Sequence, residues 1–294
     1  MTNISSKRIF PDIHPSAFQH PLDTNATESL KKVPLLPMMI SWLNARSLEQ
    51  IIRQQCLENT IRLGRNQGGS IYQAFEYACH ILDIKEIPEL YIQNQPFFNA
   101  YATGTEKHCI ILTSSLIDAL DEDEILAVIG HELGHIKCEH MLYKTVSYLL
   151  SFFGLELIRE LVPGLGQAAS VAIGYAFTHW ARKAELSCDR AALLVSQDID
   201  VVTNLIMLLA AGSRKLIPEL NLDAVLDQAK DLEDMENTII GKLVLMQELS
   251  DTHPVPIRRC VEITKWAKTK EYQDILYGIY PKVEKEVSKA EVVE

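Results

Sequence analysis

The stretch AVIGHELGHIKCEH, residues 127–140, contains two histidines four positions apart, with a glutamate directly after the first. On an α-helix, residues i and i+4 lie on one face about one turn apart, so His131 and His135 would present their imidazoles toward a common point. Zinc takes two such nitrogens at about 2.0–2.1 Å. Glu132 would be rotated by about 100° from His131, outside the ligand pair but within reach of a water held by the metal. The spacing therefore separates two ligands from a general base.

So short a pattern also occurs by chance on ordinary amphipathic helices, and its surroundings decide between the two interpretations. The motif is embedded in apolar residues, where a buried imidazole pair would need polar partners; these are Ile125, Val128, Ile129 and Leu133. Gly130 and Gly134 each cost an α-helix about 1 kcal/mol relative to alanine. We expect such glycines where another backbone or a ligand approaches closely. These surroundings favour a metal site over a surface helix.

A hydrolytic zinc site needs a third protein ligand and keeps one position for water. A metzincin would continue as HExxHxxGxxH, but here Cys138 stands at the glycine position and His140 comes one residue early. Because His140 follows His135 by five residues, it would point well away from the ligand face. We expect it to lie behind the ligands or at the surface.

A carboxylate on a later helix is the alternative source of the third ligand, and ARKAELSCDRAALLV, residues 181–195, supplies one. Glu185 and Asp189 are four residues apart on an otherwise apolar helix. Glu185 would complete a His₂Glu site, and Asp189 would accept the free N–H of a ligand imidazole, which we expect to be His131. The competing interpretation is a pair of solvated acids neutralised by nearby basic residues, namely Arg182, Lys183 and Arg190.

Three stretches, HELGHIKCEHMLYK, ARKAELSCDRAALL and THPVPIRR, together resemble the HtpX-like and CAAX-prenyl-endopeptidase-like zinc metallopeptidases, which are gluzincins. HPLD, PELYI, NAYATG and ILTSSLID resemble the soluble, single-domain branch, so the resemblance extends over residues 18–268. It implies a zincin-like domain and a zinc-dependent endopeptidase that acts on polypeptides, with a role in protein quality control near a membrane.

The resemblance also assigns roles to particular residues. One Zn²⁺ per chain would be bound by His131, His135 and Glu185, with Glu132 as the catalytic base. Asp189 and Arg182 would contact these ligands on the side away from the metal.

Two further assignments follow from the same resemblance. An edge strand formed by Asn99, Ala100, Tyr101 and Ala102 would line the cleft, where an extended substrate adds through backbone hydrogen bonds. His253 would lie near the site and steady the developing oxyanion, with Arg258 as polar support. For His253 the alternative is a capping or packing role before Pro254.

Two positions depart from the family pattern. Cys188 stands where the family commonly has alanine, and Ala181 where serine is usual before Arg182. Cys188 would place a thiol near a zinc ligand. We expect it to behave as a small buried residue, with sensitivity to oxidation or to other metals as the alternative.

Local patterns predict the elements that position these residues. Asp121, with Glu124 three residues later, forms a capping-box pattern that begins the motif helix, and Thr113 is placed to cap a shorter helix before it. Short β-branched or aromatic runs between turn residues predict a small antiparallel meander over residues 88–113. We therefore expect an α+β fold, predominantly α-helical, with the sheet packed beside the motif helix.

Helical periodicity predicts further helices over residues 41–62 and 71–84. Residues 1–38 lack sustained periodicity and are rich in Pro, His, Asp and Asn, so we expect an extended arm on the surface. Residues 39–280 would form a single metallopeptidase domain, and residues 281–294 a frayed, charged tail.

Residues 147–178 contain two nearly uncharged runs, separated by Glu156, Arg159 and Glu160 and broken at Pro163-Gly164. A membrane-spanning helix needs about 20 apolar residues, and this segment is borderline. Three interpretations remain open: a transmembrane span, a hairpin on a membrane surface, and a helical hairpin packed on the core or on a protein partner.

Composition narrows the class of protein. The chain has 39 acidic and 28 basic side chains, a formal net charge of −11, which argues against nucleic-acid binding and against adsorption of the whole molecule to anionic lipid. The six cysteines are scattered without a CxxC pair, which favours reduced thiols in a cytoplasmic compartment. The N-terminal residues lack the apolar run of a secretory signal.

Two other functions compete with the endopeptidase. A non-catalytic, zinc-stabilised protein would dock to a membrane or partner through residues 147–178, although a structural zinc site favours four protein ligands and leaves Glu132 without a role. A latent enzyme would use His14 or His20 of the N-terminal arm to occlude the cleft.

Overall fold

The computed structural model describes residues 7–33, 48–153, 166–236 and 256–283. Its α-helices are α1 Pro21–Lys31, α3 Leu48–Asn59, α4 Gly69–Ile81, α5 Ser114–Ala119, α6 Glu122–Lys137, α7 Met141–Phe153, α9 Gln167–Ser196, α10 Ile199–Ala211, α11 Leu222–Glu236, α13 Pro256–Ala267 and α14 Lys270–Leu276. Its strands are β1 Ile61–Arg62, β2 Glu89–Gln93, β3 Ala100–Thr103 and β4 Cys109–Thr113. The predicted fold class, α+β and mainly helical, is confirmed.

The four strands form one sheet in the order β1-β2-β4-β3. Strand β3 pairs antiparallel with β4, and β1 pairs antiparallel with β2, but β2 and β4 run parallel. The predicted antiparallel meander is therefore wrong in its pairing. All five residues of β4 are buried, and this apolar strand lies between β2 and β3, which leaves β3 at the edge of the sheet.

A second difference concerns the helix predicted over residues 41–62. Helix α3 ends at Asn59, and Ile61–Arg62 form the edge strand β1 instead. The first part of the prediction, residues 41–47, lies outside the described residues. The pairing of β1 with β2 joins residues distant in the sequence, which helical periodicity does not report.

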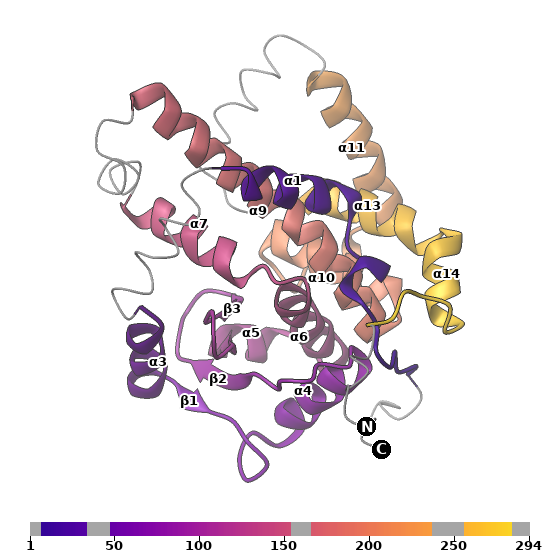
Figure 1. The fold of residues 1–294 in the computed structure, drawn as a ribbon. Coiled ribbons are helices and arrows are strands. Elements are labelled where there is room, and N and C mark those ends of the chain that lie inside the picture. The colour runs from indigo at the N-terminus through magenta and orange to yellow at the C-terminus, as the bar shows by residue number, and fades with distance from the viewer. Residues whose placement is uncertain (1–6, 34–47, 154–165, 237–255, 284–294) are drawn as a thin grey trace, which may run out of the picture.

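Helix α6 lies between two parts of the structure, with α4 and strand β3 on one side and α9 on the other (Figure 1). Gly130 and Gly134 allow α9 to approach α6 closely. A Cβ atom at Gly130 would lie 2.7 Å from Val195 Cβ, and one at Gly134 would lie 2.7 Å from Ala191 Cβ. The expectation that another chain segment approaches these glycines closely is confirmed.

The N-terminal segment differs from the expected extended surface arm. Residues Pro21–Lys31 form helix α1, with His20 as N-cap and proline at the first helical position, and α1 packs against α9 (Figure 1). Phe10 and Phe18 belong to the main hydrophobic core. Burial of these aromatic side chains holds the segment in the body of the protein.

The start of the predicted C-terminal tail pairs with this N-terminal segment. The backbone N–H of Val283 donates to Asp12 O, and that of His14 donates to Pro281 O. The rest of the predicted tail, residues 284–294, lies outside the described residues.

The apolar segment 147–178 is described only in part, as the end of α7 and the start of α9, while residues 154–165 lie outside the described residues. Helix α9 is one continuous helix of 30 residues, so its first half belongs to the same element as the predicted helix 181–195. Along the described stretches of the chain, none of the helices combines the length and the apolar character that crossing a membrane requires.

Candidate metal centre

The HExxH motif lies in the second half of helix α6. The predicted capping box is present: the Asp121 side chain accepts a hydrogen bond from the Glu124 backbone N–H, and the Glu124 side chain accepts one from the Asp121 backbone N–H. This cap satisfies backbone donors at the start of the helix and sets its first turn. The side chains of His131 and His135 therefore project from one face of a regular helix, as the spacing predicts.

Helix α9 brings Glu185 to the two imidazoles. Oε2 of Glu185 lies 3.2 Å from Nε2 of His131, and Oε1 lies 3.2 Å from Nε2 of His135. All three side chains are largely buried. Some fifty residues separate the histidines from Glu185 in the sequence, and the close packing of α6 on α9 removes this separation in space.

These distances are close to the spacing of ligand atoms around a metal ion. Ligand atoms bound at about 2.0–2.1 Å with tetrahedral angles lie about 3.3–3.4 Å apart, and each Glu185 oxygen lies 3.2 Å from one of the two Nε2 atoms. Two neutral nitrogens and one carboxylate oxygen form the donor set of a catalytic zinc site, in which a fourth position is kept for water. The residues present therefore fit such an ion.

Asp189 lies behind the first histidine, also as the spacing predicts. Its Oδ1 is 3.2 Å from Nδ1 of His131, which leaves Nε2 of that ring directed toward Glu185. Arg259 of α13 donates to both Asp189 oxygens, from Nε at 2.8 Å and from Nη2 at 2.6 Å. This bidentate pair is buried, and it holds the carboxylate in place.

The family resemblance placed Arg182 and Arg258 near the site and did not single out Arg259. Arg259 supplies the guanidinium that contacts Asp189. Burial lowers the pKa of Arg258, and the positive charge of nearby Arg182 lowers that pKa further. The missed signal is the second arginine of THPVPIRR. Only the packing of α13 on α9 tells the two adjacent arginines apart.

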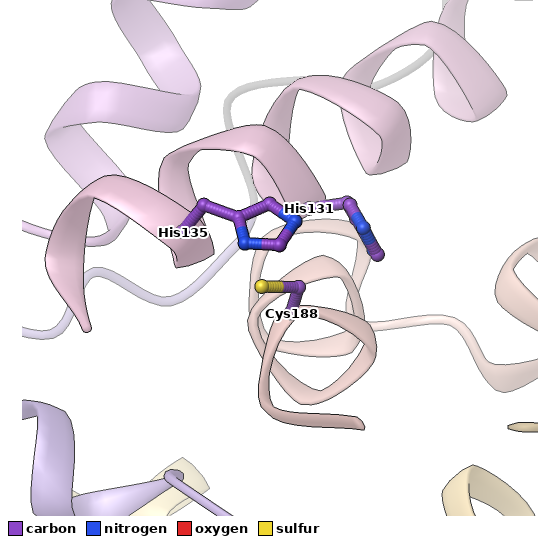
Figure 2. A group of neighbouring side chains, drawn as sticks. All are labelled: His131, His135 and Cys188. Carbon is purple, nitrogen blue, oxygen red and sulfur yellow. The ribbon is translucent and has the colours of Figure 1, made fainter. Parts of the chain in front are cut away.

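A thiol also lies beside the imidazoles. Ring nitrogens of His131 and His135 and the sulfur of Cys188 all lie within 4.8 Å of one another. Figure 2 shows the two imidazoles on one helix and Cys188 on the helix packed against it. Burial raises the pKa of the Cys188 thiol well above its ordinary value, so in the metal-free protein this group is a neutral thiol.

Glu132 points to the edge of the sheet. Its Oε2 accepts a hydrogen bond of 2.7 Å from the backbone N–H of Ala102 and lies 3.7 Å from Nζ of Lys144. Burial favours the neutral form of Glu132, but Lys144 and then the two imidazoles outweigh it and hold the pKa of Glu132 below its ordinary value. The side chain is therefore a carboxylate at neutral pH, which a general base requires.

The predicted substrate strand corresponds to β3, which begins at Ala100, and Asn99 directly precedes it. Asn99 donates its backbone N–H to Thr113 Oγ1, and its carbonyl oxygen accepts from the Thr113 N–H and hydroxyl. Thr113 is the N-cap of α5 by position, but its hydroxyl fixes the start of β3 instead of capping the helix. The hydrogen bond from the Ala102 backbone N–H to Glu132 connects this edge of the sheet to the candidate base.

The two candidate ligand histidines differ in their protonation. Burial disfavours a charge on His131, but Glu185 and Asp189 outweigh burial and raise the pKa of His131 to about 9. Burial and then Lys144 lower the pKa of His135 to about 3. In the metal-free protein His131 is therefore protonated on both ring nitrogens at neutral pH, and a metal ion must displace one of these two protons on binding.

Three predicted histidines remain. His253 lies outside the described residues. His14 accepts a hydrogen bond from Ser16 N–H, and His20 caps α1 by accepting one from Leu22 N–H, with its Nε2 3.4 Å from Oε2 of Glu262. The histidines proposed to occlude the cleft are thus engaged in capping their own segment.

Comparisons with known proteins identify the family of the chain. The family model of peptidase family M48 matches residues 69–267. The chain is 34% identical over 271 residues to the plastoglobule-localized metallopeptidase 48, chloroplastic, of Arabidopsis thaliana, in a match that covers 91% of this chain and 77% of that protein. It is 54% identical over 52 residues to a Protease HtpX homolog of Helicobacter pylori, in a match that covers 17% of each chain. No solved structure matches.

Proposed function

This chain belongs to peptidase family M48, and we propose that it is a zinc-dependent endopeptidase whose ion is held by His131, His135 and Glu185. The resemblance to HtpX-like metallopeptidases, first drawn from sequence motifs, is confirmed by the family match and by the named relatives. The single observation that carries the zinc proposal is the pair of 3.2 Å distances from Glu185 to the two Nε2 atoms. A zinc peptidase needs such a donor set with one position free.

The chain's own residues account for the remaining steps. When bound, a zinc ion supplies a Lewis acid that polarises the scissile carbonyl and lowers the pKa of water toward about 7. Glu132 takes the proton from the attacking water and delivers it to the leaving amine. The Ala102 N–H orients the Glu132 carboxylate, and Asp189 orients His131 through its Nδ1.

We assign substrate binding to the free edge of β3. Strand β3 ends the sheet, and in the described part of the chain its other edge has no strand paired to it. An extended polypeptide can add there as a further strand, with its scissile bond brought toward Glu132. Main-chain pairing of this kind favours unfolded segments and places few demands on their side chains.

Replacement of the base tests this function. Glu132→Gln keeps an oxygen that accepts from Ala102 N–H, so we expect the protein to fold and to bind zinc, while cleavage of casein falls by about 10²–10⁴-fold. Glu86→Gln, a change at an exposed glutamate before β2, is the matched control and should cleave normally. Full cleavage by zinc-loaded Glu132→Gln would exclude this role of Glu132.

We infer that the peptidase domain includes the N-terminal segment together with residues 39–280. The backbone N–H of Phe10 donates to Ile81 O, and that of His20 donates to Ser187 Oγ of α9. Deleting residues 1–38 should therefore lower the unfolding temperature and abolish cleavage. A deletion variant that folds normally and cleaves casein faster would instead support an autoinhibitory arm.

We also propose that the enzyme associates peripherally with membrane surfaces. Support comes from the plastoglobule localisation named for the Arabidopsis relative and from exposed Val171 and Tyr175 in the first half of α9. Val171→Asp with Tyr175→Asp should reduce co-sedimentation with zwitterionic phospholipid vesicles. A wild-type protein that stays entirely in the supernatant would contradict the proposal.

A further inference from the structure

A row of buried polar side chains leads from helix α1 to His135. Nδ1 of His135 lies 3.2 Å from Nδ1 of His140, and Nε2 of His140 lies 3.0 Å from Oδ2 of Asp23. His140 and Asp23 are completely buried and His135 is 1% exposed. Bulk water does not compete for these contacts, so each hydrogen has to be placed within the protein.

Asp23 is held as an acceptor from several directions. Ser187 Oγ donates to its Oδ2 at 2.6 Å, Gln19 Nε2 donates to the same oxygen at 3.0 Å, and Thr27 Oγ1 donates to Oδ1 at 3.1 Å. Ser187 itself accepts from the His20 backbone N–H, which leaves its hydroxyl hydrogen for Asp23. Burial raises the pKa of Asp23, but the bonds from His140, Ser187 and Gln19 lower it below its ordinary value.

The direction of the hydrogen bonds follows from this anchoring. An ionised carboxylate has no hydrogen to donate, so the hydrogen between Asp23 and His140 must be on Nε2 of His140. With its single ring hydrogen on Nε2, His140 has only a lone pair at Nδ1. The 3.2 Å contact between the two rings therefore requires the hydrogen to be on Nδ1 of His135. A neutral imidazole carries one N–H, so Nε2 of His135 keeps its lone pair, on the side where Glu185 lies.

We propose that Asp23 and His140 are positioning residues that hold His135 as the Nδ1–H tautomer and so present its Nε2 to the zinc ion. This inference rests on the proposed zinc site. The two ligand histidines are then held by different acceptors, because His131 faces the carboxylate of Asp189 directly whereas His135 reaches the carboxylate of Asp23 through a second imidazole.

This arrangement gives the N-terminal segment a role at the metal centre. Asp23 precedes residue 69, where the match to the family model begins, so the segment outside that match would complete the support of a ligand. Trp180 of α9 packs edge-on against the His140 ring with centroids 5.5 Å apart, and its Nε1 donates to Thr27 Oγ1. The ring of His140 is thus fixed by an aromatic contact as well as at both nitrogens.

Two variants of His140 separate positioning from simple packing. His140→Phe keeps an aromatic ring but removes the acceptor for His135, and we expect zinc binding to weaken by about 10–100-fold. His140→Gln restores an oxygen that accepts from His135 and an N–H that reaches toward Asp23, and we expect affinity to return to within about threefold of wild type. His80→Phe, at an exposed histidine, is the control. Zinc chloride is titrated against a chromophoric chelator, and circular dichroism verifies folding.

Nuclear magnetic resonance of the wild type tests the same claim without any substitution. In zinc-loaded protein labelled with ¹⁵N-histidine, long-range ¹H–¹⁵N spectra should show His135 protonated at Nδ1 and His140 protonated at Nε2 only. A His140 protonated at Nδ1, or at both nitrogens, would overturn the proposal even if His140→Phe does not fold.

The outcomes distinguish this inference from the proposed function. Wild-type zinc affinity in a folded His140→Phe protein would overturn the positioning role and leave the zinc site intact. Weakened binding that His140→Gln fails to restore would also overturn it, since packing alone would then explain the loss. A wild-type chain that binds no zinc would overturn both.

Discussion

Glu185 and Cys188 lie three residues apart on α9, and both side chains approach His131 and His135. Replacing each one separately decides which of them is a metal ligand. We predict that Glu185→Gln loses most of its zinc affinity and that Cys188→Ala keeps it.

The structure sets the size of each effect. Each Glu185 oxygen lies 3.2 Å from one of the two Nε2 atoms, so Glu185→Gln replaces a charged ligand by a neutral amide. Residues that hydrogen-bond to a metal ligand are typically worth about 10–100-fold in metal affinity. Loss of a direct ligand should exceed this, with zinc affinity falling by more than about 100-fold, or about 2.8 kcal/mol. Cys188 is fully buried and its sulfur lies 3.9 Å from Nδ1 of His140, so alanine there removes packing worth about 1 kcal/mol of folding stability but no ligand.

The assay combines affinity with spectroscopy. Protein stripped with EDTA is titrated with zinc chloride in competition with a chromophoric chelator, and urea unfolding of the metal-free form reports stability. Substitution with Co²⁺ gives a second readout, because a cobalt–thiolate bond produces a charge-transfer band in the near ultraviolet, which we expect to be absent. Glu86→Gln and Cys79→Ala are matched controls, at an exposed carboxylate and at a buried thiol of α4.

One pattern would refute this reasoning. If Cys188→Ala lost zinc while Glu185→Gln retained it, or if Co²⁺ showed a thiolate band that Cys188→Ala abolished, the site would be His₂Cys. The 3.2 Å geometry around Glu185 would then describe ion pairs of the metal-free protein alone.

Two further predictions concern the packing that holds the ligands. Arg259→Leu leaves buried Asp189 without its guanidinium and should cost about 3–5 kcal/mol in urea unfolding of the metal-free protein; a loss below about 1 kcal/mol would contradict the importance of this pair. Gly134→Ala places a Cβ 2.7 Å from Ala191 Cβ, and this overpacking should cost about 1–3 kcal/mol of folding stability. The better helix propensity of alanine offsets about 1 kcal/mol of that cost. The substitution should also weaken zinc binding, because it separates α6 from α9. Gly166→Ala, where a Cβ meets nothing within 4 Å, is the control, and tighter zinc binding by Gly134→Ala would refute the argument.

Local sequence determined the parts of the site that depend on a few neighbouring residues. Helical periodicity places His131 and His135 on one face and separates Glu132 from them, since side-chain directions on a helix repeat every 3.6 residues. The capping box at Asp121 is equally local, and the structure contains it. The signal for helix α1 was also present, as Pro21 at the first helical position with an acid in the first turn, although we expected an extended arm.

Tertiary structure alone decided the features that depend on contacts between distant segments. The parallel pairing of β2 with β4, the choice of Arg259 over its neighbour Arg258, and the approach of Asp23 to His140 all join residues far apart in the chain. No local pattern encodes these contacts, because they depend on how whole helices and strands bury their apolar faces against one another. The residue types that could bind a metal, and Asp189 beside them, were therefore readable from the sequence, whereas the contacts of Arg259 with Asp189 and of Asp23 with His140 became visible only once the helices had packed.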